Sequence, residues 1–560
     1  MASKLADLDA ALRSAIRPGM TLHLTTHCRA ATRAVQRLFR GQPLDLTLVM
    51  GRVGGGHGAD LVASGLVRRV IAGSYGAATS AHTGPLKQIQ RAHASGTVSF
   101  QHWSFYSLTQ RLMAAAQGFP WVPTYSLIGS DMARDNAAEF RVIDDPLGSG
   151  REVGLLAALQ PELSVVHALA ADAEGNTLVV PTVEDSVAGA LASREGAIVT
   201  VERVVSRDFI RRHADLMRIP ARYVRAVCEV PYGAHPGAFY SPQFPELTGY
   251  AEDQAFNTEY FAAMRDPAAL AAWVERWIHA PGSHQEYLER LGRHRLVGLH
   301  ALERASRARP AGVPGSAAAE PGLTATEALM VLATREVMRS VRAARHEVVL
   351  VGAGLSECPG SAARELLRRE GIEIRLAMGN GFYDLEPYAG YSEPELAQTL
   401  MTTDSAEIYG CILGGRPGQA LALLGAAQVD VRGNLNSTLA GGKLLTGSGG
   451  SNDAASVAST IVVGRLGRHK LVECVEYITC PGARVQALIT ERGVFRKPPG
   501  TDELILCAVF APAGEVRQAV EEIAAGCAWP VRVAPELESC PVPTALEIDT
   551  IRRMLPPRYD

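Results

Sequence analysis

The sequence predicts an α/β protein of two homologous open domains that face each other across a cleft. Short apolar runs rich in β-branched residues alternate with longer helical patterns. The runs show no clean apolar–polar alternation, which indicates strands buried on both faces of parallel sheets. The segment Asp172-Ala-Glu-Gly175-Asn176 returns as Asp430-Val-Arg-Gly433-Asn434, 258 residues later (430 minus 172). Copies this far apart exclude a solenoid or propeller, whose repeats run to ~20–50 residues, and they indicate a duplicated domain.

The repeat extends beyond the turn itself. An apolar run with small residues precedes each copy, at 163–171 and 421–429, and a Val-Glu pair follows each, at 201–202 and 472–473. An Asp-x-x-Gly-Asn sequence alone is an ordinary tight turn, so the flanks carry the inference. A cleft between two domains is the default place for a ligand.

Periodicity and propensity place the individual elements. Strands are predicted at β-branched or apolar runs bounded by turn residues, and helices at stretches of helical spacing. The strands are residues 46–50, 197–201, 347–351 and 460–463, and the helices are residues 107–117, 266–278, 324–344, 454–460 and 514–525.

A breaker-rich segment divides the chain. Residues 310–322 read Pro-Ala-Gly-Val-Pro-Gly-Ser-Ala-Ala-Ala-Glu-Pro-Gly and have almost nothing to bury, which is typical of a linker. An exposed loop inside one domain is the alternative. Thr324 and Glu327 then form a capping-box pattern that starts a helix. We therefore predict domains at residues 1–303 and 324–560, joined by a linker at 304–323.

Composition and charge exclude several classes of function. The chain has 560 residues, 47% of them hydrophobic, and a formal net charge of −3 with dispersed lysine and arginine, so we expect no nucleic-acid partner. No apolar run approaches the ~20 residues of a membrane span, and the N-terminus lacks a signal-peptide core. Nine cysteines, an odd count without a Cys-x-x-Cys pair, indicate reduced thiols. We expect a cytoplasmic protein that needs no membrane and no metal.

Three glycine-rich turns follow predicted strands or precede a helix. They lie at residues 51–58, 352–354 and 446–453. Such turns let backbone N–H groups approach an anion or a developing oxyanion, although simple turn chemistry also explains each of them. The turn at 352–354 lacks the third glycine of a dinucleotide fingerprint, and no Walker lysine follows any of the three. The densest turn, 446–453, is the best candidate for function.

His235 lies in the rigid loop Pro231-Tyr-Gly-Ala-His-Pro236, whose prolines fix their own φ. A catalytic histidine and a structural loop histidine both fit this setting. The chain has no Gly-x-Ser-x-Gly elbow and no His-Glu-x-x-His pattern, which argues against a serine hydrolase or a zinc protease.

Four segments together resemble class I CoA-transferases of the glutaconate type. They are Tyr232-Gly-Ala-His-Pro236, Gly425-Ala-Ala-Gln-Val-Asp430, Gly433-Asn-Leu-Asn-Ser-Thr438 and Gly447-Ser-Gly-Gly-Ser-Asn452. The resemblance covers nearly the whole chain, with the usual α and β subunits fused. It implies two homologous open α/β domains of the NagB/RpiA-like type with the active site between them, and coenzyme A bound as an acyl-CoA substrate.

The family mechanism depends on a glutamate that this chain lacks. In the family, a glutamate at the end of a strand attacks the thioester and gives an acyl-glutamyl anhydride and then a glutamyl-CoA thioester. The matching strand here is 374–378, and Gly379 stands at the glutamate position. Asp384 and Glu386 lie just past this turn and are the candidates to replace the missing carboxylate.

The first domain also departs from the family. Relatives carry an acid in a Glu-x-(Trp/Tyr)-Ser stretch, which here reads Gln101-His102-Trp103-Ser104. Gln101 cannot accept a proton at neutral pH, but it can orient water or hold a carbonyl. His102 is either an acid or base near pH 7 or a satisfied, half-buried histidine.

We therefore expect an acyl-CoA-processing enzyme that works without the glutamyl-CoA thioester, by hydrolysis, decarboxylation or C–C cleavage. The resemblance matches Gly450 to an oxyanion-hole amide, which would polarise the thioester carbonyl. His102 or Gln101 would then handle a proton or position water. The residues expected to bind CoA are Gly352, Gly354, Gly379, Asn380, Gly381, Gln428, Gly447, Ser448, Gly449 and Asn452.

Two alternatives stay open. A true CoA-transferase would move CoA to a small carboxylic acid with Asp384 or Glu386 as its carboxylate. A non-catalytic protein would bind acyl-CoA without turnover. Partners are thus acyl-CoA with either a carboxylic acid or water, and the helical region that carries Trp273 and Trp277 leads us to expect a homo-oligomer.

Overall fold

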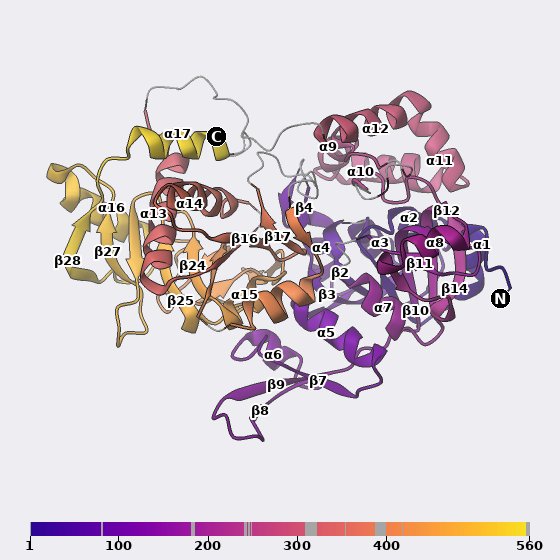
Figure 1. The fold of residues 1–560 in the computed structure, drawn as a ribbon, viewed down its shortest axis with the longest axis horizontal. Helices are drawn as coiled ribbons and strands as arrows, with labels where there is room; N and C mark the ends of the chain where they lie inside the picture. The colour runs from indigo at the N-terminus through magenta and orange to yellow at the C-terminus, as the bar shows by residue number, and fades with distance from the viewer. Residues whose placement is uncertain are drawn as a thin grey trace.

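The fold is that of a computed structural model. It describes residues 2–55, 57–79, 82–180, 185–239, 244, 247, 249–307, 322–352, 354–386, 399–416 and 418–555. The two halves of the chain each form an α/β unit and lie side by side, with residues of the first half in indigo to magenta and those of the second in orange to yellow (Figure 1).

The first half is built on a sheet whose central strands are parallel, as the buried, non-alternating runs predict. Its order is β6-β3-β2-β1-β10, and β12 and β14 continue it beyond β10. The strands are β1 (Thr21–Leu24), β2 (Leu46–Arg52), β3 (Val67–Ser74), β6 (Ser99–His102), β10 (Leu163–Ala171), β12 (Ala197–Val204) and β14 (Val224–Glu229). Helices on its faces include α2 (Arg29–Leu38), α3 (Gly58–Ala63), α5 (Phe105–Ala116) and α7 (Ser186–Ala192).

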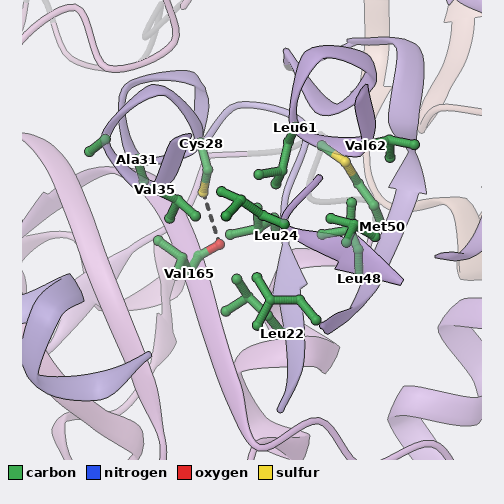
Figure 2. Packing of buried hydrophobic residues seen from close by; sticks show 14 of the residues in the cluster. Leu22, Leu24, Cys28, Ala31, Val35, Leu48, Met50, Leu61, Val62 and Val165 are labelled. Atoms are coloured by element: carbon green, nitrogen blue, oxygen red, sulfur yellow. Dashed lines mark hydrogen bonds between the residues drawn. The ribbon is translucent and has the colours of Figure 1, made fainter. Parts of the chain in front are cut away.

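One face of this sheet packs against α2 and α3. Figure 2 shows Leu24 of β1 between side chains of both helices, with Leu22 further along the strand, and all of these residues are buried. The Cys28 thiol at the start of α2 donates to the carbonyl oxygen of Val165 in β10 at 2.9 Å. Burial raises the pKa of this thiol to about 12, so Cys28 is an inert core residue.

The second half repeats the arrangement. Strands β16-β15-β19-β24-β25 are parallel. Antiparallel pairs continue the sheet through β17 and β18 on one side and through β26 and β27 on the other, where β28 then pairs with β27 in parallel. The parallel strands are β15 (Val348–Val351), β16 (Arg375–Met378), β19 (Ala420–Leu424), β24 (Ser459–Val463) and β25 (Val485–Ile489), and the flanking strands are β17 (Phe382–Leu385), β18 (Thr399–Thr402), β26 (Gly493–Arg496), β27 (Ile505–Val509) and β28 (Val533–Ser539). The helices are α13 (Ala325–Ala344), α14 (Glu357–Arg369), α15 (Ser451–Val457), α16 (Val516–Gly526) and α17 (Ala545–Met554).

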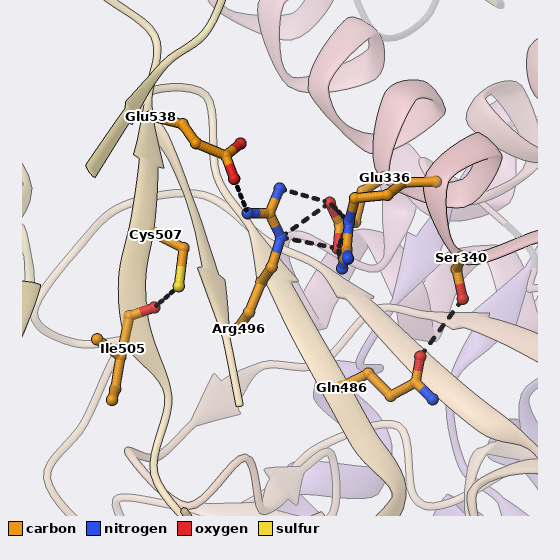
Figure 3. Close-up of polar contacts among 8 residues, drawn as sticks. Glu336, Ser340, Gln486, Arg496, Ile505, Cys507 and Glu538 are labelled. Atoms are coloured by element: carbon orange, nitrogen blue, oxygen red, sulfur yellow. Dashed lines mark hydrogen bonds and ion pairs between the residues drawn. The ribbon is translucent and has the colours of Figure 1, made fainter. Parts of the chain in front are cut away.

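Helix α13 is fixed to this sheet by a buried ion pair. Glu336 of α13 is 3% exposed and pairs with Arg496 of β26, which also reaches Glu538 of β28 (Figure 3). Thr324 and Glu327 form the predicted capping box at the start of this helix. The new domain therefore begins with a helix, as the sequence indicates.

The repeated Asp-x-x-Gly-Asn segments form the same hydrogen-bonded turn. Asn176 donates to the carboxylate of Asp172 at 2.7 Å, and Asn434 donates to Asp430 at 3.0 Å. Each asparagine side chain also accepts a hydrogen bond from the backbone N–H of a residue that follows a proline. The donor is Ala221 for Asn176 and Gly482 for Asn434. The duplication is thus visible in the bonding pattern as well as in the sequence.

Three details differ from the sequence-based expectations. The helix expected at 454–460 is α15 at Ser451–Val457, because the β-branched run that follows it forms β24 between two parallel neighbours. The Val-Glu pair at 472–473 lies outside the strands, so it is not the counterpart of the pair at 201–202 in β12. Helix α12 (Arg293–Arg307) extends into the predicted linker, of which residues 308–321 lie outside the described residues.

The two tryptophans before the linker are core residues. Trp273 of α10 (Pro267–Val274) and Trp277 of the π-helix Glu275–His279 are buried, and both rings contact Phe256 of α9 (Gln254–Ala263), with centroids 5.3 and 5.0 Å away. They hold the helical region together rather than forming an exposed patch.

Candidate active site

A cavity of about 560 Å³ lies between the two halves, at the carboxyl ends of parallel strands from both sheets. Ligands of open α/β folds bind at this edge of the sheet, and the cleft predicted from the duplication lies there. The first half contributes Arg52, Ser74, Gly76, Phe105 and Glu252, among others, and the second half contributes the ends of β15, β16 and β19, the aromatic ring of Tyr409 and the glycine-rich turn before α15.

Seven of the residues expected at the site line this cavity. They are Gly352, Gly379, Asn380, Gly447, Ser448, Gly449 and Gly450. Gly354, Gly381, Gln428 and Asn452 do not line it. Gly381, with φ +113°, completes the tight turn between β16 and β17, a backbone conformation that favours glycine. The Gln428 amide oxygen accepts from Asn436 at 2.9 Å, within the second half.

The glycine-rich turn is held by the first half of the chain. The Gly449 N–H donates to the Gly73 carbonyl at 2.8 Å, and the Phe105 N–H donates to the Gly449 carbonyl at 2.9 Å. The Tyr75 N–H donates to the Thr446 carbonyl at 2.8 Å. Both halves therefore form one wall of the cavity. Hydrogen bonds with the first half hold the backbone of the glycine-rich turn in position.

Asn452 joins the halves instead of facing the cavity. It is fully buried, its amide oxygen accepts the Leu127 N–H at 2.8 Å, and its amide nitrogen donates to the Thr479 carbonyl at 2.8 Å. Both polar ends of the side chain are thus used within the protein. The structure places Asn452 as a support beneath the glycine-rich turn.

Asp453 is a second buried support that the sequence reasoning missed. Its carboxylate accepts hydrogen bonds from the hydroxyls of Ser104 and Ser126 and from the Tyr106 N–H at 3.0 Å, all from the first half. Burial raises the pKa of Asp453 to about 6, and these hydrogen bonds only partly offset that effect. The cue in the sequence was the acid after Asn452 at the start of a helix, but spacing alone does not show that its partners lie more than 300 residues away.

The space beside Gly379 is occupied by the hydroxyl of Tyr409. A β-carbon built on Gly379 would collide with the Tyr409 hydroxyl oxygen, and a β-carbon on Gly450 would collide with the same atom. Tyr409 belongs to the π-helix Glu407–Leu413, is 4% exposed and lines the cavity. The position at which the resemblance implies a glutamate is therefore a glycine packed against a phenol.

Asn380, next to Gly379, offers a polar atom to the cavity. Its amide oxygen Oδ1 is buried and accepts no hydrogen bond from the residues that the structure describes. A buried polar atom without a partner carries a free-energy cost of about 1–3 kcal/mol. The atom is thus available to a ligand or a water molecule in the cavity.

Asp384 and Glu386 are held away from the cavity lining. Arg364 of α14, itself buried, reaches Asp384 at 3.3 Å and Glu386 at 2.7 Å, and Arg375 reaches Asp384 at 2.7 Å. Neither carboxylate lines the cavity. The antiparallel turn after β16 directs the chain into β17, and the arginines fix both acids there.

Gln101 and His102 lie at the end of β6 and do not line the cavity. The Tyr75 hydroxyl donates to the Gln101 carbonyl at 2.9 Å and lies 3.0 Å from Nδ1 of His102. Burial lowers the pKa of His102 to about 4, so the ring is neutral at pH 7. This geometry is that of a satisfied, buried histidine.

His235 has a similar environment. It is fully buried, with Nδ1 2.7 Å from the Tyr287 hydroxyl and Nε2 3.1 Å from Asp253. Burial lowers its pKa to about 4 despite the hydrogen bond with Asp253. The structural alternative for this loop histidine fits these contacts, and the residue is not in the cavity.

Metal-binding clusters and membrane-spanning helices are both lacking in the described residues. No group of three or more histidine, cysteine, aspartate or glutamate side chains is arranged to hold a metal ion there. Nor does that part of the chain contain a helix with the length and apolar character to cross a membrane.

Comparison with known proteins relates both halves to one family. The sequence model described as coenzyme A transferase matches residues 5–230. One of the two subunits of glutaconate CoA-transferase from Acidaminococcus fermentans is 26% identical over 283 residues, 48% of this chain and 85% of its own length. The other subunit of the same enzyme is 24% identical over 253 residues, 38% of this chain and 90% of its own length. The chain thus combines what is two subunits in that relative.

Other relatives carry different names. An uncharacterized protein of Archaeoglobus fulgidus is 32% identical over 202 residues, 36% of this chain, and the match spans only 43% of that protein. The cholesterol ring-cleaving hydrolase IpdA subunit of Rhodococcus jostii is 27% identical over 285 residues, 49% of this chain and 90% of that protein.

Among solved structures, an acyl-CoA transferase from E. coli O157:H7, in a thioester complex with CoA, has the same fold over nearly the whole chain. The TM-score is 0.65 at 18% identity, over 99% of this chain and 98% of that one.

Proposed function

We propose that this chain, which belongs to the coenzyme A transferase family, processes an acyl-CoA in the cavity between its halves without forming a glutamyl-CoA thioester. Hydrolysis, decarboxylation or C–C cleavage of a β-keto- or dicarboxylic-type acyl-CoA is the chemistry that fits. One relative named as a transferase subunit and one named as a hydrolase subunit each match about half of this chain, at 26% and 27% identity, which supports a change of reaction on this scaffold.

The observation that carries the proposal is the absence of a carboxylate at Gly379. A covalent route needs a positioned nucleophile within reach of the thioester carbon, and glycine has none. The space that a side chain would use is filled by the Tyr409 hydroxyl. Asp384 and Glu386 are the first acids that follow this glycine along the chain, and both pair with Arg364 outside the cavity lining.

The groups that do line the cavity suit a reaction in which charge develops on the thioester oxygen. Gly450 brings a backbone N–H that would polarise this oxygen, and Asn380 brings a buried amide that would hold a polar group or a water molecule. The placement of His102 and Gln101 outside the cavity lining gives no support to a proton-transfer role for either.

A panel of acyl-CoA thioesters tests the proposal directly. Free CoA, carbon dioxide and new acyl-CoA species are measured with and without added carboxylic acids as acceptors, for the native chain and for Asp384→Asn and Glu386→Gln. We expect turnover that needs no acceptor acid, seen as free CoA for hydrolysis or as a shortened or opened acyl-CoA for decarboxylation or C–C cleavage. Both variants should retain it within about threefold, because the two side chains lie outside the cavity lining.

Two other results would support the alternatives. CoA transfer that requires an acceptor acid and is abolished by Asp384→Asn or Glu386→Gln would identify a true transferase. Binding of acyl-CoA by calorimetry with no turnover across the panel would identify a non-catalytic acyl-CoA-binding protein.

A further inference from the structure

The hydroxyl of Tyr409 lies at the point in the cavity wall where the reaction of a thioester is expected. Its hydroxyl oxygen lies against the backbone of both Gly379 and Gly450, so it stands between the former glutamate position and the expected oxyanion-binding amide. Tyr106 of α5 lies beside the ring, with the two ring centroids 6.4 Å apart.

Two glycines are required for this arrangement. Gly379 and Gly450 come from different elements, the end of β16 and the turn before α15, and any larger residue at either position would displace the phenol. A tyrosine that only filled the core would not need its hydroxyl to reach two backbone segments on a cavity wall. The phenol oxygen therefore lies beside two glycines that, like Tyr409 itself, line the cavity.

A phenol and a carboxylate have opposite capabilities. An ionised glutamate only accepts hydrogen bonds and attacks carbon, whereas a neutral phenol, with an ordinary pKa of about 10, donates a hydrogen bond at pH 7. A phenol in place of a glutamate therefore removes a nucleophile and adds a hydrogen-bond donor at the same position.

We propose that Tyr409 is a catalytic residue that donates a hydrogen bond to the thioester oxygen as negative charge develops on it. The inference rests on the proposed function. It narrows the substrates to acyl-CoAs whose reaction builds an enolate or a tetrahedral oxyanion at the thioester carbonyl. No bond to the enzyme forms. In hydrolysis the oxygen of water adds to the thioester carbon as the carbonyl pair moves to oxygen, and on collapse that pair re-forms C=O, the C–S bond breaks and the CoA sulfur leaves with a proton from the water. In decarboxylation the pair of the broken C–CO2 bond forms the C=C of an enolate, carbon dioxide leaves, and the enolate carbon then takes a proton from water. The phenol keeps its proton throughout.

The experiment compares Tyr409→Phe with Tyr106→Phe in the full-length chain, using an acyl-CoA that the native protein turns over. Tyr106 is a matched control because its ring packs beside Tyr409 but does not line the cavity. We expect kcat of Tyr409→Phe to fall about 100- to 1000-fold, as for loss of one oxyanion donor, with KM changed less than about threefold and Tyr106→Phe near native.

The possible outcomes separate the two proposals. Turnover by the native chain with equal kcat in both variants would overturn the role of Tyr409 and leave the proposed function standing. A rise in KM without a fall in kcat would also overturn it, since it would show ground-state binding only. A native chain that binds acyl-CoA but turns over none of the panel would overturn the proposed function, and the catalytic role of Tyr409 with it.

Discussion

The hydroxyl oxygen of Tyr409 occupies the volume into which a side chain at Gly379 would project. The sequence resemblance implies that class I CoA-transferases carry the attacking glutamate at this position. In this chain the position is a glycine, and a phenol from a different segment fills the space beside it. The effect of a substitution at Gly379 should therefore depend on whether the Tyr409 side chain is present.

The first prediction concerns stability. Gly379→Ala should destabilise the fold by about 1–3 kcal/mol, the usual cost of overpacking a rigid site, because its β-carbon would collide with the Tyr409 hydroxyl. In a Tyr409→Ala background the same change should cost little. Thermal unfolding of the four proteins of this cycle measures the coupling. Gly298→Ala, at a helical glycine with open space around it, is the control and should stabilise the fold by up to about 1 kcal/mol, since alanine favours a helix interior over glycine. If the two substitutions had additive effects on the free energy of unfolding, the contact between the Gly379 position and the Tyr409 hydroxyl would be contradicted.

The second prediction concerns chemistry. Gly379→Glu combined with Tyr409→Ala should place a carboxylate at the position used by the family and clear the space for it. After incubation with an acyl-CoA, hydroxylamine should convert the introduced glutamate to a hydroxamate, as detected by peptide mass spectrometry. Gly379→Glu alone should give less adduct because the glutamate side chain and the Tyr409 phenol compete for the same space. Equal labelling of the single and double variants would show that Tyr409 does not fill this space.

The third prediction concerns the contact between the halves. Asn452→Ala leaves the Leu127 N–H and the Thr479 carbonyl buried without their partner. We expect a loss of about 2–3 kcal/mol in the free energy of unfolding. The control is Ser456→Ala on the same helix, whose hydroxyl donates to the Asn452 carbonyl and whose loss should cost below about 1 kcal/mol. Similar losses in denaturant titrations would count against a special role for Asn452.

The fourth prediction concerns pH. The pKa of Asp453 is about 6 in the folded protein, above its ordinary value of 3.8, because the carboxyl is buried. The folded state therefore binds this proton more tightly than the unfolded state, and the stabilisation is lost as the pH rises through about 6. The melting temperature of the native chain relative to Asp453→Asn should fall between pH 4 and pH 7. A difference that stays constant or rises over this range would show that Asp453 is ionised in the fold.

Much of the fold followed from the sequence, for physical reasons. Buried parallel strands have a distinctive composition, and the Thr324–Glu327 cap is local, so both could be inferred from neighbouring residues. The end of α15 was misplaced because its last turn adjoins the β-branched run of β24, and sheet pairing outweighs local helical spacing there.

The site was predicted less completely. The glycine-rich turn and Gly379 were found because glycine patterns are local, and the structure brings both to one cavity. Tyr409 was missed because its position depends on how a π-helix packs on two glycines distant in sequence, which no spacing rule encodes. The alternative acids, Asp384 and Glu386, looked available only because the sequence does not show that Arg364 pairs with both of them.

The most direct test of the central claim is covalent trapping on the native chain. The protein is incubated with a turned-over acyl-CoA, treated with hydroxylamine or borohydride, digested and examined for modified carboxylates by mass spectrometry. We predict turnover with every aspartate and glutamate unmodified. A CoA-dependent modification of Asp384, Glu386 or any other carboxylate at the cavity would contradict the account and restore the transferase mechanism.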